Sequence, residues 1–191
     1  MNGLLFIRHA ETDLAGTFCG HSDPPVNARG HQQIQALMRC LADEPIDAIY
    51  SSDLSRAVIT ANAFAEAFGA RVTTSPTLRE IHFGQWEGLT WNEIERRDAA
   101  YAKHWTEAFP HLPAPGGELF AQFEARVRSE VDRLLLLAQD KRIAVVTHAG
   151  VMRLVLETYC GYTAQRARAQ TASYCCTFTC APSLTPHEVT A

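Results

Sequence analysis

Two apolar runs, far apart in the chain, each end directly before a histidine. Leu4 to Ile7 is followed by Arg8 and His9, and Ile143 to Thr147 is followed by His148. Short continuous apolar runs are typical of parallel strands that are buried on both faces of a sheet. Ligands of open α/β sheets bind at the carboxyl ends of the strands. The two runs therefore predict strands whose histidines face one another across a single site.

The rest of the chain alternates between helical and strand patterns. Asn27 is placed to cap the first helix, Ser51-Ser52-Asp53 to cap the second, and Gly69 to end it. Apolar helical stripes fall within residues 34–41, 54–68, 120–134 and 151–159, and further strands are expected at 46–50, 71–74 and 173–180. This alternation predicts an α/β fold, a three-layer α/β/α sandwich around a mostly parallel sheet.

The chain is long enough for one substantial core, since it has 191 residues and no linker or charge run divides it. We therefore expect a single domain over residues 1–191. Residues 90–117 combine a weakly amphipathic, broken helix pair with a loop, and such an insert suits a lid over a binding site. The polar residues 182–191 are expected to form a flexible tail.

The composition argues against several classes of protein. The net charge of −4 disfavours a general nucleic-acid binder, and no apolar run is long enough to cross a bilayer. No signal-peptide pattern is present, so a cytoplasmic location without membrane partners is expected. The six cysteines lack the spacing of a disulfide framework and are expected to be reduced.

Two arginines lie where they could bind an anion. Arg8 precedes His9, and a neighbouring cation disfavours a second positive charge on the imidazole, which suits a neutral nucleophile. Arg56 falls in the first turn of its predicted helix, where backbone amides are free to bind an anion. Together the two arginines predict an anionic substrate.

A loop between residues 78 and 88 has neither helical nor strand period and contains two glycines beside aromatic residues. This pattern predicts an ordered loop. Glu80 and Glu87 lie in it, and either could donate a proton in catalysis or be a solvated surface charge.

Four motifs follow one another along the chain. They are Arg8-His9-Ala10-Glu11-Thr12, Arg56 after Ser51-Ser52-Asp53-Leu54-Ser55, Glu80 with the Gly84-Gln85-Trp86-Glu87-Gly88 loop, and Thr147-His148-Ala149-Gly150. With these motifs the chain resembles the histidine phosphatase superfamily, in its phosphoglycerate mutase-like branch. The resemblance covers Leu4 to about Leu156, and it implies a phosphoglycerate mutase-like fold and a phosphatase that acts on a small-molecule phosphate monoester.

The resemblance also implies catalytic roles. His9 would accept the phosphoryl group as nucleophile, and Glu80 would protonate the leaving oxygen and later activate water. The residues that would bind the phosphate oxygens are Arg8, Arg56 and His148. Because arginines supply the positive charge that Mg²⁺ supplies elsewhere, neither a metal nor another cofactor is expected.

The loop after His9 departs from many relatives, which have glycine after the histidine and an asparagine further on. Here Ala10 and the run Leu14-Ala15-Gly16 occupy these places. The candidates for additional phosphate contacts are therefore Thr12, Cys19 and the amide of Gly20.

Within the family, several short runs are most similar to α-ribazole phosphatases of cobalamin assembly: Gly20-His21, Pro24-Pro25, Ala28-Arg29-Gly30 and Gly116-Gly117-Glu118. Three alternatives remain, namely a phosphoglycerate mutase-type phosphotransferase, a broad sugar-phosphate phosphatase and a non-catalytic phosphate-binding module. The compact chain and its five catalytic-type residues favour hydrolysis, by a monomer or homodimer. Aromatic residues of the lid could stack on a flat heterocyclic leaving group or form the lid's own core: Trp91, Tyr101, Trp105 and Phe109.

Overall fold

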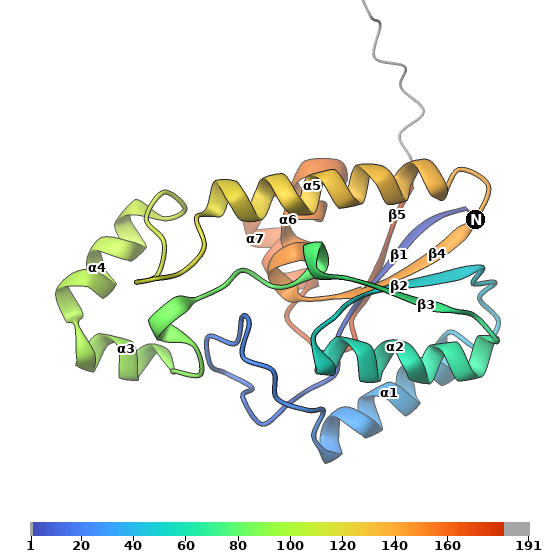
Figure 1. Ribbon diagram of the computed structural model, residues 1–191, viewed down its shortest axis with the longest axis horizontal. Coiled ribbons are helices and arrows are strands. Elements are labelled where there is room, and N and C mark those ends of the chain that lie inside the picture. Colours follow the sequence, from blue (N-terminus) through green and yellow to red (C-terminus); the bar gives the residue numbers. More distant parts are fainter. Residues whose placement is uncertain (1, 182–191) are drawn as a thin grey trace, which may run out of the picture.

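A five-stranded sheet lies between layers of helices in the computed structural model, which describes residues 2–181 (Figure 1). Its strands are β1 (Gly3–Arg8), β2 (Ala48–Ser52), β3 (Val72–Ser75), β4 (Arg142–Thr147) and β5 (Thr177–Cys180), in the order β3-β2-β4-β1-β5. β1 to β4 pair in parallel, and β5 pairs antiparallel with β1 at one edge. The predicted α/β sandwich around a mostly parallel sheet is confirmed.

β1 and β4 are central in the sheet because their side chains are apolar on both faces. On one face, Leu4, Phe6, Ile143 and Val145 pack with α5 (Phe120–Leu137) and α6 (Ala149–Tyr159). On the other, Leu5, Ile7, Ala144 and Val146 pack with α1 (Ala28–Cys40) and α2 (Ser55–Phe68). Figure 1 shows α5 on one side of the sheet and α1 and α2 on the other. The short helix α7 (Ala164–Gln170) packs against α6.

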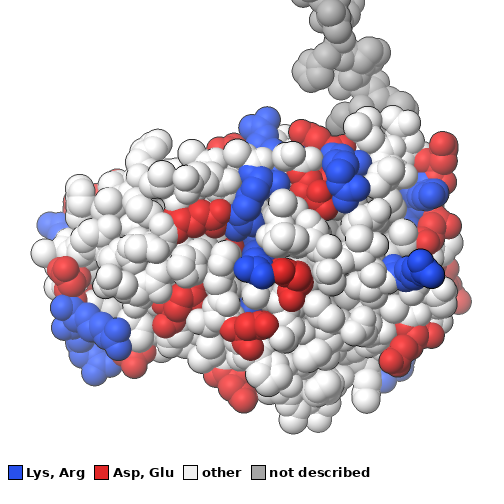
Figure 2. Space-filling view, viewed as in Figure 1, with Lys and Arg blue, Asp and Glu red and all other residues white. Residues whose placement is uncertain are grey.

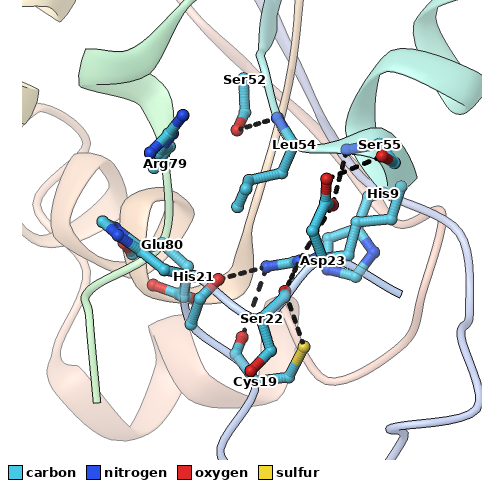
Figure 3. Close-up of polar contacts among 12 residues, drawn as sticks. His9, Cys19, His21, Ser22, Asp23, Ser52, Leu54, Ser55, Arg79 and Glu80 are labelled. Carbon is cyan, nitrogen blue, oxygen red and sulfur yellow. Dashed lines mark hydrogen bonds and ion pairs between the residues drawn. The ribbon is translucent and has the colours of Figure 1, made fainter. Parts of the chain in front are cut away.

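The start of α2 differs from the prediction. α1 is capped as expected, because the Asn27 side chain accepts from the Gly30 amide at 2.8 Å. Ser51-Ser52-Asp53 does not cap α2, since β2 runs through Ser52. Asp23 caps the helix from a distant loop instead, and its two carboxylate oxygens accept from the amide and the hydroxyl of Ser55, both at 2.7 Å (Figure 3). The loop after β1 is thereby fixed to the amino end of α2.

The expected lid is a separate helical lobe. It contains α3 (Trp91–Arg97) and α4 (Ala99–Ala108), which extend away from the sheet at the left of Figure 1. Two short 3-10 helices, η1 (Pro76–Leu78) and η2 (Gly84–Trp86), lie on the chain that leads to it. Buried Trp86, Ile94, Ala102 and Ala114 pack there with a ring of aromatic side chains. The predicted broken helix pair is confirmed, and the lobe has a core of its own.

Some sequence-based expectations concern the ends of the chain. The β-prone run 173–180 forms a strand only from Thr177 onward. The flexible tail expected at residues 182–191 lies outside the described part of the chain. Among the helices of residues 2–181, none has the length and apolar composition needed to span a bilayer.

Candidate active site

The two strand-end histidines lie side by side. Arg8 of β1 is paired with Thr147 of β4, so the next residues, His9 and His148, leave the sheet at the same edge. The His9 amide donates to the Thr147 carbonyl at 2.9 Å, and the two ring centroids are 5.0 Å apart. Both histidines are buried, with 7% of His9 and 0% of His148 exposed. The strand register therefore brings together the pair that the sequence predicted.

The surroundings of His9 keep its ring neutral and fix its tautomer. Nδ1 lies 2.7 Å from the carbonyl oxygen of Ala10. Because a carbonyl can only accept, this contact assigns the proton to Nδ1 and the lone pair to Nε2. Burial lowers the pKa of His9 well below its ordinary value, and Arg56 lowers it further, while the bond to Ala10 opposes both effects. A neutral ring with its lone pair on Nε2 is suited to nucleophilic attack.

His148 is held in the opposite tautomer. Its Nδ1 is 3.2 Å from Nη2 of Arg56, which can only donate, and its Nε2 is 2.9 Å from Oγ of Ser52. Nε2 therefore carries the proton. Burial, followed by the charges of Arg56 and His9, lowers the pKa of His148 well below its ordinary value. The Nε2–H group is the only donor of this neutral ring, and an anionic oxygen could accept from it in place of Ser52.

Arg56 brings a positive charge into the buried site. It is 0% exposed and lies in the first turn of α2. Nη1 donates to the Ser22 carbonyl at 2.6 Å and Nη2 to the Gly20 carbonyl at 2.7 Å. The Asp23 carboxylate is 4.0 Å away and its side chain is 40% exposed. A buried guanidinium that is bonded mainly to neutral carbonyls keeps most of its charge uncompensated, and it therefore attracts anions.

Arg8 is the second uncompensated cation at this edge. Nη1 donates to the carbonyl oxygens of Thr171 and Ala172, at 2.9 and 2.7 Å. Cζ lies 4.0 Å from the ring centre of Tyr174, whose ring is 5.5 Å from that of His9. These contacts fix Arg8 to the segment between α7 and β5. No ion pair joins it to a carboxylate within residues 2–181.

Glu80 reaches the site from the loop after β3. It is buried, and its carboxylate accepts from the Gly150 amide at 2.8 Å and from the Ile81 amide at 3.0 Å. Gly150 is the second residue of α6, directly after His148 and Ala149. A Cβ atom at position 150 would overlap the Glu80 carboxylate. The glycine of the His148 motif therefore lets Glu80 dock on the first turn of α6.

Arg126 of α5 holds the backbone that carries Glu80. Its guanidinium donates to the carbonyl oxygens of Thr77, Arg79 and Glu80 at 2.9, 2.7 and 2.9 Å. Glu118 binds the same guanidinium through both oxygens, at 2.7 and 2.8 Å. Arg126 and Glu118 are positioning residues for Glu80. No pattern in the sequence singles out Arg126, because it is one of several polar residues on a long amphipathic helix.

Glu87 has the contacts of a structural carboxylate. It accepts from the backbone amides of four residues at 2.8 to 3.0 Å: Gly20, His21, Ser22 and Phe83. Burial raises the pKa of Glu87, but the amide hydrogen bonds outweigh burial and lower the pKa below its ordinary value. An ionised carboxylate therefore holds loop 20–22 beside η2. Of the two glutamates suggested by the sequence, Glu80 remains as the candidate acid.

The three additional phosphate-contact candidates differ in their availability. The Gly20 amide is already bonded to Glu87 at 3.0 Å, so it is not free in the way that the sequence suggested. Sγ of Cys19 lies 3.7 Å from the Ser22 carbonyl, beside the loop drawn in Figure 3. Thr12 is buried, and its backbone forms an isolated bridge with Val26. Loop 12–25 thus contributes to the site mainly through the carbonyl groups that hold Arg56.

A cavity of about 960 Å³ opens beside Glu80 and Gly150. Its aromatic wall comes from the loop after β1, the loop before η2, the lobe of α3 and α4, and α5: Phe18, Phe83, Trp91, Trp105, Phe109, Phe120 and Phe123. Its polar wall, on α6 and α7, contains Arg153, Glu157, Gln165 and Arg168. Tyr101 does not line the cavity, and its hydroxyl donates to the Pro113 carbonyl at 3.0 Å within the lid. Trp91 and Trp105 thus belong to both the core of the lobe and the cavity wall, whereas Tyr101 belongs only to the core and Phe109 only to the wall.

The described chain matches a known family along almost its whole length. The model of the histidine phosphatase superfamily (branch 1) matches residues 4–181. The chain belongs to the histidine phosphatase superfamily. It is accordingly a phosphatase of a family in which a histidine nucleophile is typical.

Relatives of this histidine phosphatase carry names of small-molecule phosphatases. The adenosylcobalamin/alpha-ribazole phosphatase of Escherichia coli (strain K12) is 32% identical over 164 residues, which cover 85% of this chain and 81% of the relative. Phosphoserine phosphatase 1 of Hydrogenobacter thermophilus is 31% identical over 159 residues, which cover 82% and 74%. The crystal structure of the alpha-ribazole phosphatase from Shigella flexneri matches with a TM-score of 0.81 at 31% identity, over 91% of this chain and 87% of that chain. These similarities confirm the phosphoglycerate mutase-like fold and the phosphatase class.

The positive charge of this histidine phosphatase site comes from arginine side chains. Arg56 is fully buried, and Arg8 lies beside His9. Within residues 2–181, no group of three or more His, Cys, Asp or Glu side chains is arranged to hold a metal ion. The side chains gathered beside His9 are therefore guanidinium and imidazole groups.

The lowered pKa values of His9 and His148 predict that both rings stay neutral as pH falls through about 6.5, the value for an unperturbed histidine. In ¹H–¹³C NMR spectra, we expect their Cε1–H signals to shift little between pH 7.5 and 6. The signals are assigned by their loss in His9→Ala and His148→Ala. Because the unfolded chain binds more protons below about pH 6.5, the free energy of unfolding should decrease with further acidification. A titration midpoint at or above 6.5 for either ring would contradict this electrostatic picture.

Proposed function

We propose that this phosphatase hydrolyses α-ribazole 5′-phosphate through a phosphohistidine at His9. The proposed chemistry is carried by one observation, a pair of neutral buried histidines beside two guanidiniums. Arg8 has no ion pair within residues 2–181, and Arg56 has only the partly exposed Asp23 carboxylate, 4.0 Å away. At an effective dielectric constant of 20, two unit charges 4 Å apart interact by about 4 kcal/mol. The cations Arg8 and Arg56 would therefore dominate the binding of a phosphoryl group, with the Nε2–H of His148 as a further donor.

In the first step, Nε2 of His9 attacks phosphorus with its lone pair. The bond from phosphorus to the ester oxygen breaks, and protonated Glu80 transfers its proton to that oxygen. Arg8, Arg56 and His148 stabilise the charge on the equatorial oxygens, which is the main catalytic requirement of phosphoryl transfer. The dephosphorylated alcohol then leaves on the side of Glu80.

In the second step, water attacks the phosphohistidine. Glu80, now a carboxylate, takes a proton from the water, and the bond between phosphorus and Nε2 breaks. The proton returns Glu80 to its acid form, and inorganic phosphate is released. Among the additional candidates, Thr12 and Cys19 retain side chains that could contact phosphate, whereas the Gly20 amide would first have to leave Glu87.

The choice of leaving group rests on the cavity beside Glu80 and on the named relatives. An acid that protonates the ester oxygen must lie beside the leaving group, and Glu80 borders the aromatic cavity. Stacking of a flat heterocycle contributes about 0.5–1.5 kcal/mol per ring pair beyond area burial. This is smaller than the electrostatic binding of phosphate, so the aromatic wall would select among phosphate monoesters instead of creating affinity for phosphate.

We expect kcat/KM for α-ribazole 5′-phosphate to exceed that for ribose 5-phosphate by about tenfold or more, which corresponds to roughly 1.4 kcal/mol. Phe109 is 51% exposed and lines the cavity, so Phe109→Ala should reduce this ratio. Tyr101→Phe is the matched control, because Tyr101 belongs to the lid's core and does not line the cavity. Released phosphate is measured for each enzyme and substrate.

Two outcomes would discard the ribazole assignment. One is equal kcat/KM values for the two substrates, which would indicate a broad sugar-phosphate phosphatase. The other is conversion of 3-phosphoglycerate into its 2-phospho isomer without release of phosphate, which would indicate a mutase. Neither outcome would contradict a phosphohistidine at His9.

A further inference from the structure

The polar wall of the cavity carries two arginines that the proposed reaction does not use. Arg153 lies on α6, and Arg168 lies on α7. We propose that they form an anion subsite, which binds a second negatively charged group, a carboxylate or a phosphate, on the leaving group of the substrate. The proposal rests on the phosphatase reaction at His9 and specifies the substrate class of the same site.

The first support is the lack of ion pairs at these arginines within residues 2–181, although Glu157 lies on the same wall. Two arginines elsewhere around the active-site loop are paired, Arg79 with Asp53 at 2.6 Å and Arg126 with Glu118 at 2.7 Å. Within residues 2–181, neither Arg153 nor Arg168 forms an ion pair with a carboxylate. An exposed arginine needs no partner because water solvates it, but Arg153 is half-buried. Arg153 thus resembles Arg8, which is also partly buried and unpaired, whereas Arg168 is exposed and enters the proposal through its place on the cavity wall.

The second support is the closeness of other arginines to Arg153. Burial has the largest effect on the pKa of Arg153 and lowers it. Among nearby charges, Glu80 has the largest effect and raises this pKa, Arg168 and Arg8 lower it, and Glu157 raises it. Figure 2 shows basic side chains in the middle of the viewed face, with acidic side chains beside them. A bound anion would relieve the repulsion between the two arginines.

The position of Arg153 relates the subsite to the reacting phosphate. Its Nε donates to the hydroxyl of Thr171 at 3.0 Å, and the carbonyl of the same residue accepts from Arg8 at 2.9 Å. One buried threonine therefore joins a guanidinium that faces the phosphoryl group to one that lines the cavity. The terminal nitrogens of Arg153 remain available to a ligand. A second anionic group close to the ester phosphate could accept from both of these nitrogens. The two donors of a guanidinium group match carboxylate or phosphate oxygens.

The aromatic and cationic walls together define a substrate class. A flat heterocycle would contact the aromatic wall, and a further anionic group would contact Arg153 and Arg168 on the opposite wall. α-Ribazole 5′-phosphate would engage the aromatic wall alone. A phosphate monoester whose leaving group also carries a carboxylate or phosphate would engage the subsite.

The test compares substrates that differ by one anionic group. Glycerol 3-phosphate is paired with 3-phosphoglycerate, and adenosine 5′-monophosphate with adenosine 3′,5′-bisphosphate, so that the two pairs distinguish a carboxylate from a phosphate. In the wild-type enzyme, we expect kcat/KM for phosphate release to be at least fivefold higher for the more anionic member of one or both pairs. Arg153→Gln and Arg168→Gln should each bring that ratio toward one.

Arg166→Gln is the matched control, because Arg166 also lies on α7 and is exposed like Arg168, but it stacks on Tyr162 at 4.2 Å and does not line the cavity. This variant should keep the wild-type ratio. Calorimetric binding of the adenosine pair to His9→Ala, with and without Arg168→Gln, gives the same comparison without turnover. Ratios near one in the wild type, or ratios that neither substitution changes, would overturn the subsite. Absence of phosphate release from every substrate would contradict the proposed reaction, and the calorimetric ratio would still decide on the subsite.

Discussion

His9→Ala is expected to reduce kcat/KM by about 10⁴-fold or more, because loss of a nucleophile removes the covalent route altogether. Quenching the wild-type enzyme during turnover of ³²P-labelled substrate should trap phosphate on the protein. A phosphorus–nitrogen bond at histidine is labile in acid and stable in base, so the label should have these properties. It should be absent from His9→Ala.

The matched control is His31→Ala, which removes an exposed histidine of α1. This enzyme should retain wild-type rate and labelling. Acid-stable label, or label that persists in His9→Ala, would place the covalent intermediate on another residue. Unchanged circular dichroism of the His9→Ala protein would show that lost activity does not reflect unfolding.

Glu80→Gln is expected to slow alkyl phosphates by roughly 10²- to 10⁴-fold, the usual contribution of general acid–base catalysis. The loss should be much smaller for phosphorylation of His9 by aryl phosphates, since a phenolate departs without a proton. The measurement is the burst rate of alcohol or phenol release for a series of leaving groups. Gln keeps the size of the side chain and can accept from the Gly150 amide, but its single oxygen cannot also accept from the Ile81 amide, so circular dichroism and Tm are compared with the wild type.

Glu87→Gln provides the comparison. Its carboxylate accepts four backbone amides, and an amide group offers one acceptor oxygen where the carboxylate offers two. We expect a lower Tm and similar losses for alkyl and aryl phosphates. If Glu80→Gln also slowed both substrate classes equally, its assignment as the acid would be wrong.

The parts of this molecule that the sequence predicted are those with a local pattern. The buried strands before His9 and His148 are continuous apolar runs, and the register of two parallel neighbours then brings the histidines together. Arg56 could be placed in a first helical turn because the strand, turn and helix around it follow one another directly. The motifs of the family supplied the role of Glu80.

The parts that the sequence did not predict depend on contacts between distant segments. Asp23 caps a helix that begins 32 residues later. The prediction that Ser51-Ser52-Asp53 caps this helix was therefore wrong. Glu87 resembled Glu80 as a loop carboxylate, and only the four amides around it distinguish its role. Arg126 has no distinguishing pattern, because its partners lie in a loop about 46 residues earlier. Such roles follow from the folded path of the chain.

The close approach of Gly150 to Glu80 ties two motifs that are 70 residues apart in the chain. Any side chain at position 150 would push the carboxylate away from the first turn of α6, so an alanine there would act as an indirect mutation of Glu80. The first turn of α6 and the loop after β3 can therefore change only together, because the Glu80 carboxylate occupies the space that a side chain at position 150 would need.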